Sequence, residues 1–171
     1  MTKMAFLLIG IVSVFQAGAA IVEKTVKYEQ GGAELEGYHA SDDELEGKRP
    51  GVLITHQWTG LSDYQKLRAR MLTEMGFNVF AADVYGKGVR PQPPESGEVA
   101  GKYKKDRKPC SARMLAGLEV QKSDERTALG KLAAIGYFFG GTGVLEPARA
   151  GVPLQGVVGC RDSGYLDERS F

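Results

Sequence analysis

The chain has 171 residues, of which 43% are hydrophobic and 25% are charged, and its formal net charge is +1. These values are typical of one globular domain with an ordinary hydrophobic core. They exclude a strongly basic protein, so we expect no binding to nucleic acid, which requires clustered positive charge.

The first 20 residues predict a secretory signal peptide. Lys3 precedes an uncharged stretch at 4–22, and small residues at 17–20 follow its apolar centre. A basic residue, an apolar run and an Ala-x-Ala-like cleavage site occur in this order in signal peptides. The alternative is an uncleaved membrane anchor, but the run is short and contains Gly, Ser and Gln. We therefore expect export to the periplasm or the medium, with no stable membrane span once the signal is removed.

The first half of the mature chain predicts strands and one helix. Two glycines at 31–32 separate two runs as in a β-hairpin, and two short apolar runs follow as in buried strands. These strands are expected at 25–30, 33–39, 51–56 and 78–84. Polar residues at 62–63 cap a helix that ends near Met75 and presents Leu67 and Met71 on the same apolar face as Met75.

The second half predicts two further strands and several helices. Residues from 95 to about 122 have a helical pattern that Pro109 divides or kinks. After a linker at 123–130, we expect a strand at 132–135, a helix at 144–150 and a last strand at 154–158. Because apolar strands alternate with helices, the predicted fold class is α/β, with a mostly parallel sheet flanked by helices.

The end of the chain and the cysteines add little. Residues 159–171 have no helix or strand period, so we expect a divergent, disordered tail after a domain at 21–158. Cys110 and Cys160 are the only cysteines and lack the spacing of metal ligands, so no metal is expected. Outside the cytoplasm these two thiols could pair or stay free.

The most informative pattern is KLAAIGYFFGG at 131–141. A short apolar strand, a glycine-flanked turn and then a helix form the setting of a nucleophile elbow, G-x-S-x-G. The central residue of an elbow is Ser or Cys, because a hydroxyl or thiol must attack the acyl carbon. Here that residue is Phe138. The glycines do not form G-x-G-x-x-G, since Glu146 takes the third place, so we expect no cofactor.

Three segments together resemble the dienelactone hydrolase family of α/β-hydrolases: ITHQWTGL at 54–61, AADVYGKGVRP at 81–91 and AIGYFFGGTG at 134–143. The resemblance covers about 28–158. It implies an α/β-hydrolase-type sheet and hydrolysis of small esters or lactones, with a Cys nucleophile where this chain has Phe138. In that family an Asp and a His follow the nucleophile, whereas His39 and His56 precede the elbow here.

The resemblance also suggests roles for single residues. The backbone N–H of Phe139 corresponds to an oxyanion donor. Gln57, where some relatives carry Glu, and His56 lie at the oxyanion and activation loop. The candidates for substrate binding are Trp58, Arg90 and Tyr137. The plainer alternatives are a structural His56 at a strand end, a Trp58 packed under its loop, an Arg90 solvated in its loop, and a surface or hairpin His39.

These observations predict a secreted hydrolase-family domain that is truncated after the strand following the elbow and inactive as written. The alternatives are a non-catalytic module that binds a small molecule, or the product of a disrupted gene. Without further strands, Leu154, Val157 and Val158 would lie on an exposed sheet edge. Such an edge favours self-association.

Overall fold

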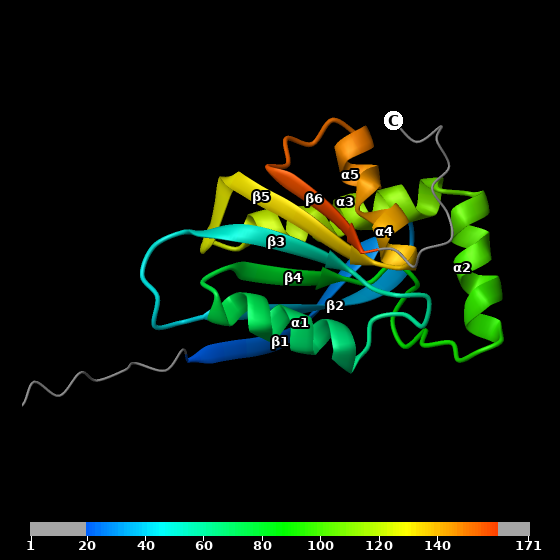
Figure 1. Ribbon diagram of the computed structural model, residues 1–171, viewed down its shortest axis with the longest axis horizontal. Helices are drawn as coiled ribbons and strands as arrows, with labels where there is room; N and C mark the ends of the chain where they lie inside the picture. Colours follow the sequence, from blue (N-terminus) through cyan, green and yellow to red (C-terminus); the bar gives the residue numbers. More distant parts are fainter. Residues whose placement is uncertain (1–19, 161–171) are drawn as a thin grey trace, which may run out of the picture.

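The computed structural model describes residues 20–160, which form one six-stranded sheet with helices on both faces (Figure 1). The order is β1-β2-β4-β3-β5-β6, in which β1 and β2 are antiparallel to their neighbours and the other pairs are parallel. The strands are β1 (Ile21–Gln30), β2 (Ala33–Asp42), β3 (Arg49–Thr55), β4 (Asn78–Ala82), β5 (Thr127–Tyr137) and β6 (Gly156–Cys160). The helices are α1 (Asp63–Glu74), α2 (Glu95–Lys105), α3 (Lys108–Ser123), α4 (Phe139–Gly143) and α5 (Leu145–Arg149). The predicted α/β class with a mostly parallel sheet is confirmed.

The core has two layers, one on each face of the sheet. Figure 1 shows α1 in front of the sheet and α3 behind it. Behind the sheet, Leu53 and Phe80 pack against Met114 and Leu118 of α3. In front, α1 lies over β2 and β4, where Ala69 is buried in the second cluster. Successive side chains of β3 and β4 point alternately into the two core layers. Both faces of these strands are therefore buried, which explains their continuous apolar runs.

The apolar face predicted for α1 is wrong. Leu67, Met71 and Met75 are 48%, 42% and 71% exposed, whereas Gln65 and Ala69 are fully buried. Gln65 is held inward because its side-chain oxygen accepts hydrogen bonds from the N–H and hydroxyl of the N-cap serine, at 3.0 and 2.8 Å. The small Ala69 lets the helix approach the sheet closely. Capping and close approach thus outweigh apolar periodicity in setting the buried face.

Several predicted boundaries also move. The hairpin strands are longer than expected and pair from Ile21↔Asp42 to Gln30↔Ala33. The helix predicted at 144–150 corresponds to α5, and a further short helix that was not predicted, α4, precedes it. The helical region predicted to be divided or kinked at Pro109 is divided into α2 and α3, and Pro109 lies in the first turn of α3, which needs no N–H from proline. The predicted tail at 159–171 begins later, since Gly159 and Cys160 belong to β6.

The linker predicted at 123–130 is partly wrong, because β5 begins at Thr127. The Thr127 hydroxyl donates to the carbonyl of Gln121 at 2.7 Å and accepts from the Asn78 amide at 2.8 Å. Those bonds start β5 beside β3 before its apolar run. A register shift opposite Pro50 and Gly51 then restores the pairing.

The predicted signal peptide at 1–20 lies almost entirely outside the described residues. Within residues 20–160, none of the helices has the length and apolar character to cross a membrane.

Candidate active site

The candidate site is the turn between β5 and α4. Phe138 has φ +52° and ψ −108°, and it is the one non-glycine residue with positive φ in the described part of the chain. Its N–H donates to the carbonyl of Cys160 at 2.7 Å, and its carbonyl accepts the N–H of Gly141 at 3.0 Å. A bulky residue rarely adopts this strained backbone unless its surroundings impose it. The turn therefore has the sharp shape of a nucleophile elbow.

The Phe138 ring is 49% exposed, so it projects outward from the turn rather than into the core. A nucleophile at this position would be presented to solvent in the same way. A phenyl ring has no lone pair and no acidic proton. It can contact a ligand but cannot attack an acyl carbon.

Glycines allow the close packing that shapes this turn. A Cβ added at Gly136 would collide with the backbone carbonyl of Gly140. A Cβ at Gly140 would lie 2.5 Å from the carbonyl oxygen of Thr55 and 2.6 Å from that of His56. Real Cβ atoms do not approach backbone so closely. Both positions must be glycine for α4 to rest on β3 and β5.

Phe139 contributes its ring to the core and only its backbone to the turn. The ring is 3% exposed and stacks on His56, with centroids 5.8 Å apart. It also contacts Tyr85 and Tyr103, at centroid distances of 5.2 and 6.3 Å. These ring contacts anchor Phe139 at the start of α4. They therefore restrict the position of its backbone N–H, the predicted oxyanion donor.

His56 is fully buried and uses both ring nitrogens. Nδ1 lies 2.6 Å from the carbonyl oxygen of Gln57, and Nε2 accepts the N–H of Val84 at 3.1 Å. The proton therefore resides on Nδ1. Burial lowers the pKa of His56 to about 4, against an opposing contribution from the hydrogen bond to Gln57. This neutral ring ties the end of β3 to the end of β4, as the structural alternative expects, and has no nitrogen left to exchange a proton with a ligand.

Asp83 organises the loop after β4, and the sequence analysis missed it. One carboxylate oxygen accepts the N–H groups of Tyr85 and Gly86 at 3.1 and 3.0 Å, and the other accepts the N–H of Glu36 at 3.1 Å. The signal was present as an Asp directly before a glycine-containing turn, where such side chains bind nearby backbone N–H groups. Asp83 is fully buried and so cannot contact a ligand.

Three other predicted site residues, Gln57, Trp58 and Tyr137, lie in the loop after β3 or at the end of β5. Gln57 begins a tight turn in which its carbonyl accepts the N–H of Gly60 at 3.2 Å. Trp58, next in the chain, is 43% exposed, and a Cβ at Gly97 of α2 would lie 3.8 Å from its ring. Tyr137 is 7% exposed. Its phenol ring therefore supports the turn from within.

Arg68 was also missed. Its guanidinium lies over the rings of Tyr64 and Tyr137, at 5.2 and 5.7 Å from their centroids. The two tyrosines meet edge to face at 5.2 Å. The signal was the spacing of Tyr64 and Arg68 by four residues, which places them on one flank of α1. This cluster closes the side of the turn that faces α1.

Arg90 and His39 lie away from the turn. The Arg90 guanidinium donates to the carbonyls of Gly86 and Val89. His39 lies near Asp124, with Nε2 and Oδ2 3.4 Å apart, at the end of the sheet where the parallel strands begin. The elbow is at the opposite end of the sheet from His39, whereas Arg90 lies at the same end as the elbow but in the loop after β4, where its hydrogen bonds stay within that loop.

Cys110 and Cys160 are both free thiols in this structure, one buried and one exposed. Among residues 20–160, no cluster of three or more His, Cys, Asp or Glu could hold a metal ion. The turn thus presents the exposed Phe138 ring and the backbone N–H of Phe139.

Comparisons with known proteins point to one family. A sequence model of the dienelactone hydrolase family matches residues 35–160. The structure is similar to a dienelactone hydrolase-like promiscuous phosphotriesterase from metagenomic libraries, with 34% identity, a TM-score of 0.79, and coverage of 83% of this chain and 59% of that one. A protein described as m3DLH is 31% identical, with a TM-score of 0.79 and coverage of 87% and 63%.

A more distant structure, a cold-adapted esterase from an Arctic intertidal metagenomic library, is 18% identical with a TM-score of 0.67, and the alignment covers 81% of this chain and 60% of that one. It shares the fold. No curated protein matches the chain. The chain spans about three fifths of the length of the solved structures that it resembles.

Proposed function

Because the chain belongs to the dienelactone hydrolase family, we propose that it is an ester- or lactone-hydrolase domain in which Phe138 prevents the covalent step. The ancestral reaction is hydrolysis through a cysteine nucleophile, and the ligand class is a small ester or lactone. Export through a signal peptide at 1–20 is part of the proposal and rests on the sequence pattern.

The observation that carries the proposal is the position of Phe138 at a preserved elbow. In the family reaction, a thiolate attacks the acyl carbon and the developing oxyanion binds the N–H of the following residue, here Phe139. A second N–H comes from the loop after the neighbouring strand, here the turn that begins at Gln57. In the proposal, the chain keeps these backbone donors and lacks the attacking atom. Loss of the nucleophile removes most of the rate of a linked triad.

The direct test is turnover by the purified chain. We expect hydrolysis of p-nitrophenyl acetate and of a dienelactone to equal the rate of the buffer control, with folding verified by circular dichroism. Saturable turnover that disappears on substitution within 137–141 would contradict the interpretation of the elbow. Turnover unaffected by those substitutions would also contradict the proposal, because it would place catalysis at another site.

A second candidate function is binding without turnover, which the retained Phe139 N–H and the exposed Phe138 ring favour. Trp58 is the only tryptophan of the chain and is 43% exposed in the loop after β3, so its fluorescence would report on a ligand that reaches this loop. A saturable change in this fluorescence with a lactone that is not hydrolysed would support a binding module. An unchanged spectrum would leave no role for the turn as a ligand site.

Replacing Phe138 with Cys should create a reactive thiol but no family-like turnover. The new thiol would share the exposure of Phe138, yet neither histidine of this chain can deprotonate it. His56 has both nitrogens engaged, and His39 is at the other end of the sheet. Labelling with iodoacetamide in a Cys160→Ser background should therefore show one additional reactive site, because Cys110 is buried.

Phe138→Ser is the matched control for this substitution, since it presents a hydroxyl in place of the thiol. We expect both variants to hydrolyse p-nitrophenyl acetate no faster than the parent chain over multiple turnovers. Full rescue by the single Cys substitution would show that another group supplies the base and would contradict our description of His56.

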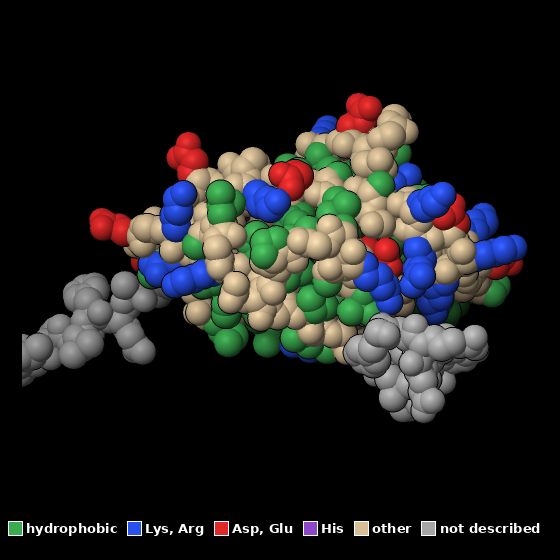
Figure 2. Space-filling view, turned by 90° about the horizontal axis from the view of Figure 1, so that it is seen from above, with side chains coloured by type: hydrophobic (Ala, Val, Ile, Leu, Met, Phe, Trp, Pro, Cys, Tyr) green, Lys and Arg blue, Asp and Glu red, His purple; other side chains and the backbone are tan. Residues whose placement is uncertain are grey.

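We also propose that a second copy of the chain pairs with β6. Figure 2 views the molecule from the side on which β5 and β6 lie, where hydrophobic side chains gather along the middle. In the described sheet β6 is an edge strand; it carries no charge, and Val158 is 52% exposed. The other edge, β1, carries Glu23 and Lys24, charges that discourage pairing.

Size-exclusion chromatography with light scattering should therefore show oligomers of the mature chain that increase with concentration. Val158→Lys introduces a charge on this edge and should shift the population toward monomer, whereas Val22→Lys on β1 should not. A monodisperse monomer with a sharp cooperative melt at all concentrations would contradict the pairing.

A further inference from the structure

A basic corner lies where α2 ends and α3 begins, at residues 102–108. Its five cations are all exposed, and Asp106 is the one carboxylate of the segment. The cations are Lys102, Lys104, Lys105, Arg107 and Lys108. Figure 2 shows Lys and Arg side chains gathered at the right-hand end of the molecule, where α2 lies in Figure 1. Because the whole chain has a net charge of only +1, this corner is far more basic than the remainder of the chain.

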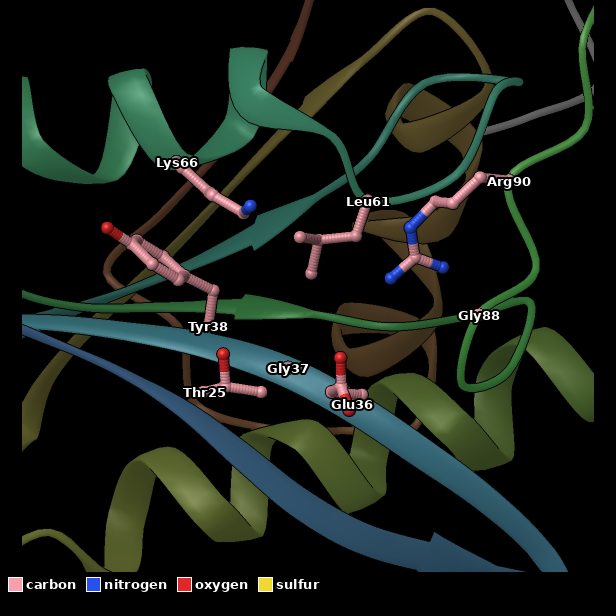
Figure 3. A pocket seen from close by; sticks show the side chains of 8 residues that line it. All are labelled: Thr25, Glu36, Gly37, Tyr38, Leu61, Lys66, Gly88 and Arg90. Atoms are coloured by element: carbon pink, nitrogen blue, oxygen red, sulfur yellow. The ribbon is translucent and has the colours of Figure 1, made fainter.

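The cations of the basic corner form no ion pair in the described part of the chain. By contrast, in the hollow of about 270 Å³ shown in Figure 3, Lys66 contacts Asp63 at 2.9 Å and Arg90 donates to two carbonyls of its own loop. The Asp106 carboxylate accepts the N–H of Lys108 at 3.1 Å, so it is directed toward the start of α3. Within residues 20–160, the charges of the corner are therefore not neutralised.

Local helix stability does not account for all of these cations. Those in the last turn of α2 are favourable, because the C-terminal end of a helix carries partial negative charge. At the start of α3 the sign is opposite, and there Arg107 is the N-cap and Lys108 the first residue, with no acidic residue in the first turn. These two cations oppose the helix dipole. Residues that break a local rule in this way are typical of functional surfaces.

Trp58 lies on the flank of α2 that also carries Lys104. A Cβ added at Gly97 would lie 3.8 Å from the Trp58 ring, and Lys104 follows Gly97 by about two helical turns on the same face. Between them, a Cβ at Gly101 would meet no atom within 4 Å, so this face is open. The adjacent Glu98 is turned away from Gly97 by about 100°. An indole ring that is 43% exposed and the basic corner are thus presented on one surface.

We propose that this surface binds the anionic headgroups of a lipid bilayer, with the Trp58 ring entering the boundary between headgroups and acyl chains. Clusters of roughly four to eight Lys and Arg residues bind anionic lipid, and Trp prefers this boundary. Single-stranded nucleic acid instead binds in a basic groove lined by stacked aromatic rings, whereas the cations here lie on an exposed corner between two helices. The contact is peripheral and requires no membrane-spanning helix. It does not depend on hydrolysis at the elbow or on the Phe138 variants.

The test is cosedimentation of the full chain with vesicles. Vesicles of phosphatidylcholine alone are compared with vesicles of equal parts phosphatidylcholine and phosphatidylglycerol, which are anionic. We expect binding to the anionic vesicles to be tighter by a factor on the order of a hundred or more, and the difference to disappear in about 1 M sodium chloride, where charges are screened. The apolar residues at 4–22 would act on both vesicle types alike. Equal binding to the two vesicle types would overturn the proposal.

The first variant removes three cations from α2: Lys102→Gln, Lys104→Gln and Lys105→Gln. We expect a loss of affinity for anionic vesicles of about a hundredfold, which is about fivefold for each charge. The matched control changes the net charge equally through three other exposed lysines that form no ion pair within the described residues: Lys27→Gln, Lys48→Gln and Lys131→Gln. It should retain most of the affinity, and an equal loss in the control would contradict the assignment to the basic corner.

The second variant separates binding from folding, because Arg107→Gln with Lys108→Gln removes charges that oppose the dipole of α3. It should bind anionic vesicles about 25-fold more weakly and melt no earlier than the parent chain. Unchanged binding by this folded variant would contradict the proposal even if the triple variant failed to fold.

The fluorescence of Trp58, the only tryptophan, distinguishes a bilayer from other polyanions. Anionic vesicles should shift its emission to shorter wavelength, because the ring enters an apolar region. Polyglutamate and oligothymidylate supply charge without such a region and should leave the wavelength unchanged. An unshifted emission with bound vesicles, or tighter binding of either polymer than of vesicles at equal salt, would overturn the assignment to lipid.

Discussion

Lowering the pH from 7 to 4 should reduce the free energy of unfolding by about 3 kcal/mol through His56 alone. In the folded chain the pKa of His56 is about 4, lowered chiefly by burial, whereas an unfolded histidine has a pKa near 6.5. Between these values the unfolded state binds the proton and the folded state does not. Stability is therefore fully present above pH 6.5 and is lost as the pH falls toward 4.

His39 acts in the same direction. Burial lowers its pKa, Asp124 opposes that shift, and Lys24 and Arg126 nearby add to it. Burial alone would raise the pKa of Asp124, but hydrogen bonds from Arg126 hold it at about 2. Asp124 therefore contributes to the loss only in more acidic solution than this test uses. The fall in stability between pH 6.5 and 4.5 is assigned to the two histidines.

Urea unfolding followed by circular dichroism between pH 7 and pH 4.5 measures this dependence. His56→Asn keeps one acceptor and one donor without titrating, so it should be less stable at pH 7 but show a flatter pH profile. Adding His39→Gln to this variant should remove the pH dependence of stability that remains between pH 6.5 and 4.5. A parent profile as flat as that of His56→Asn would contradict the buried, neutral histidine.

Gly136→Ala should destabilise the chain by about 3 kcal/mol or more, because a methyl group there collides with the backbone carbonyl of Gly140. Backbone cannot rotate away as a flexible side chain can. Gly130→Ala is the matched control in the same strand, since a Cβ there has no atom within 4 Å. It should change stability by no more than about 0.5 kcal/mol.

Thermal unfolding of the two variants gives the comparison. The Gly136→Ala chain should melt well below the parent or fail to fold, and Gly130→Ala should melt with the parent. Equal melting temperatures would mean that α4 can lift from β5, in which case the turn would not be the rigid structure described.

The sequence located the sheet because its central strands are buried on both faces and so appear as short continuous apolar runs, as at Val52–Ile54 and Val79–Ala82. It located the turn because Gly136 and Gly140 are required by backbone contacts a few residues apart. Both patterns lie within a few consecutive residues. The central strands and the turn could therefore be predicted from the sequence.

Other features depend on partners distant in sequence and were not predictable. The buried face of α1 follows from the bond between Gln65 and its N-cap, combined with close contact to the sheet. The start of β5 depends on Thr127 meeting Asn78 across 49 positions. Composition and periodicity contain no record of these contacts.

The contact between Gly140 and the carbonyls of β3 has a consequence for how the family motif is used. The steric requirement for glycine at these positions belongs to the fold and does not depend on the residue between them, so a folded chain needs the glycines whether or not a nucleophile is present. A search that scores the glycines identifies descendants of the fold, whether or not they are enzymes. The residue between them, here Phe138, has to be examined separately, because the glycines carry no information about the nucleophile.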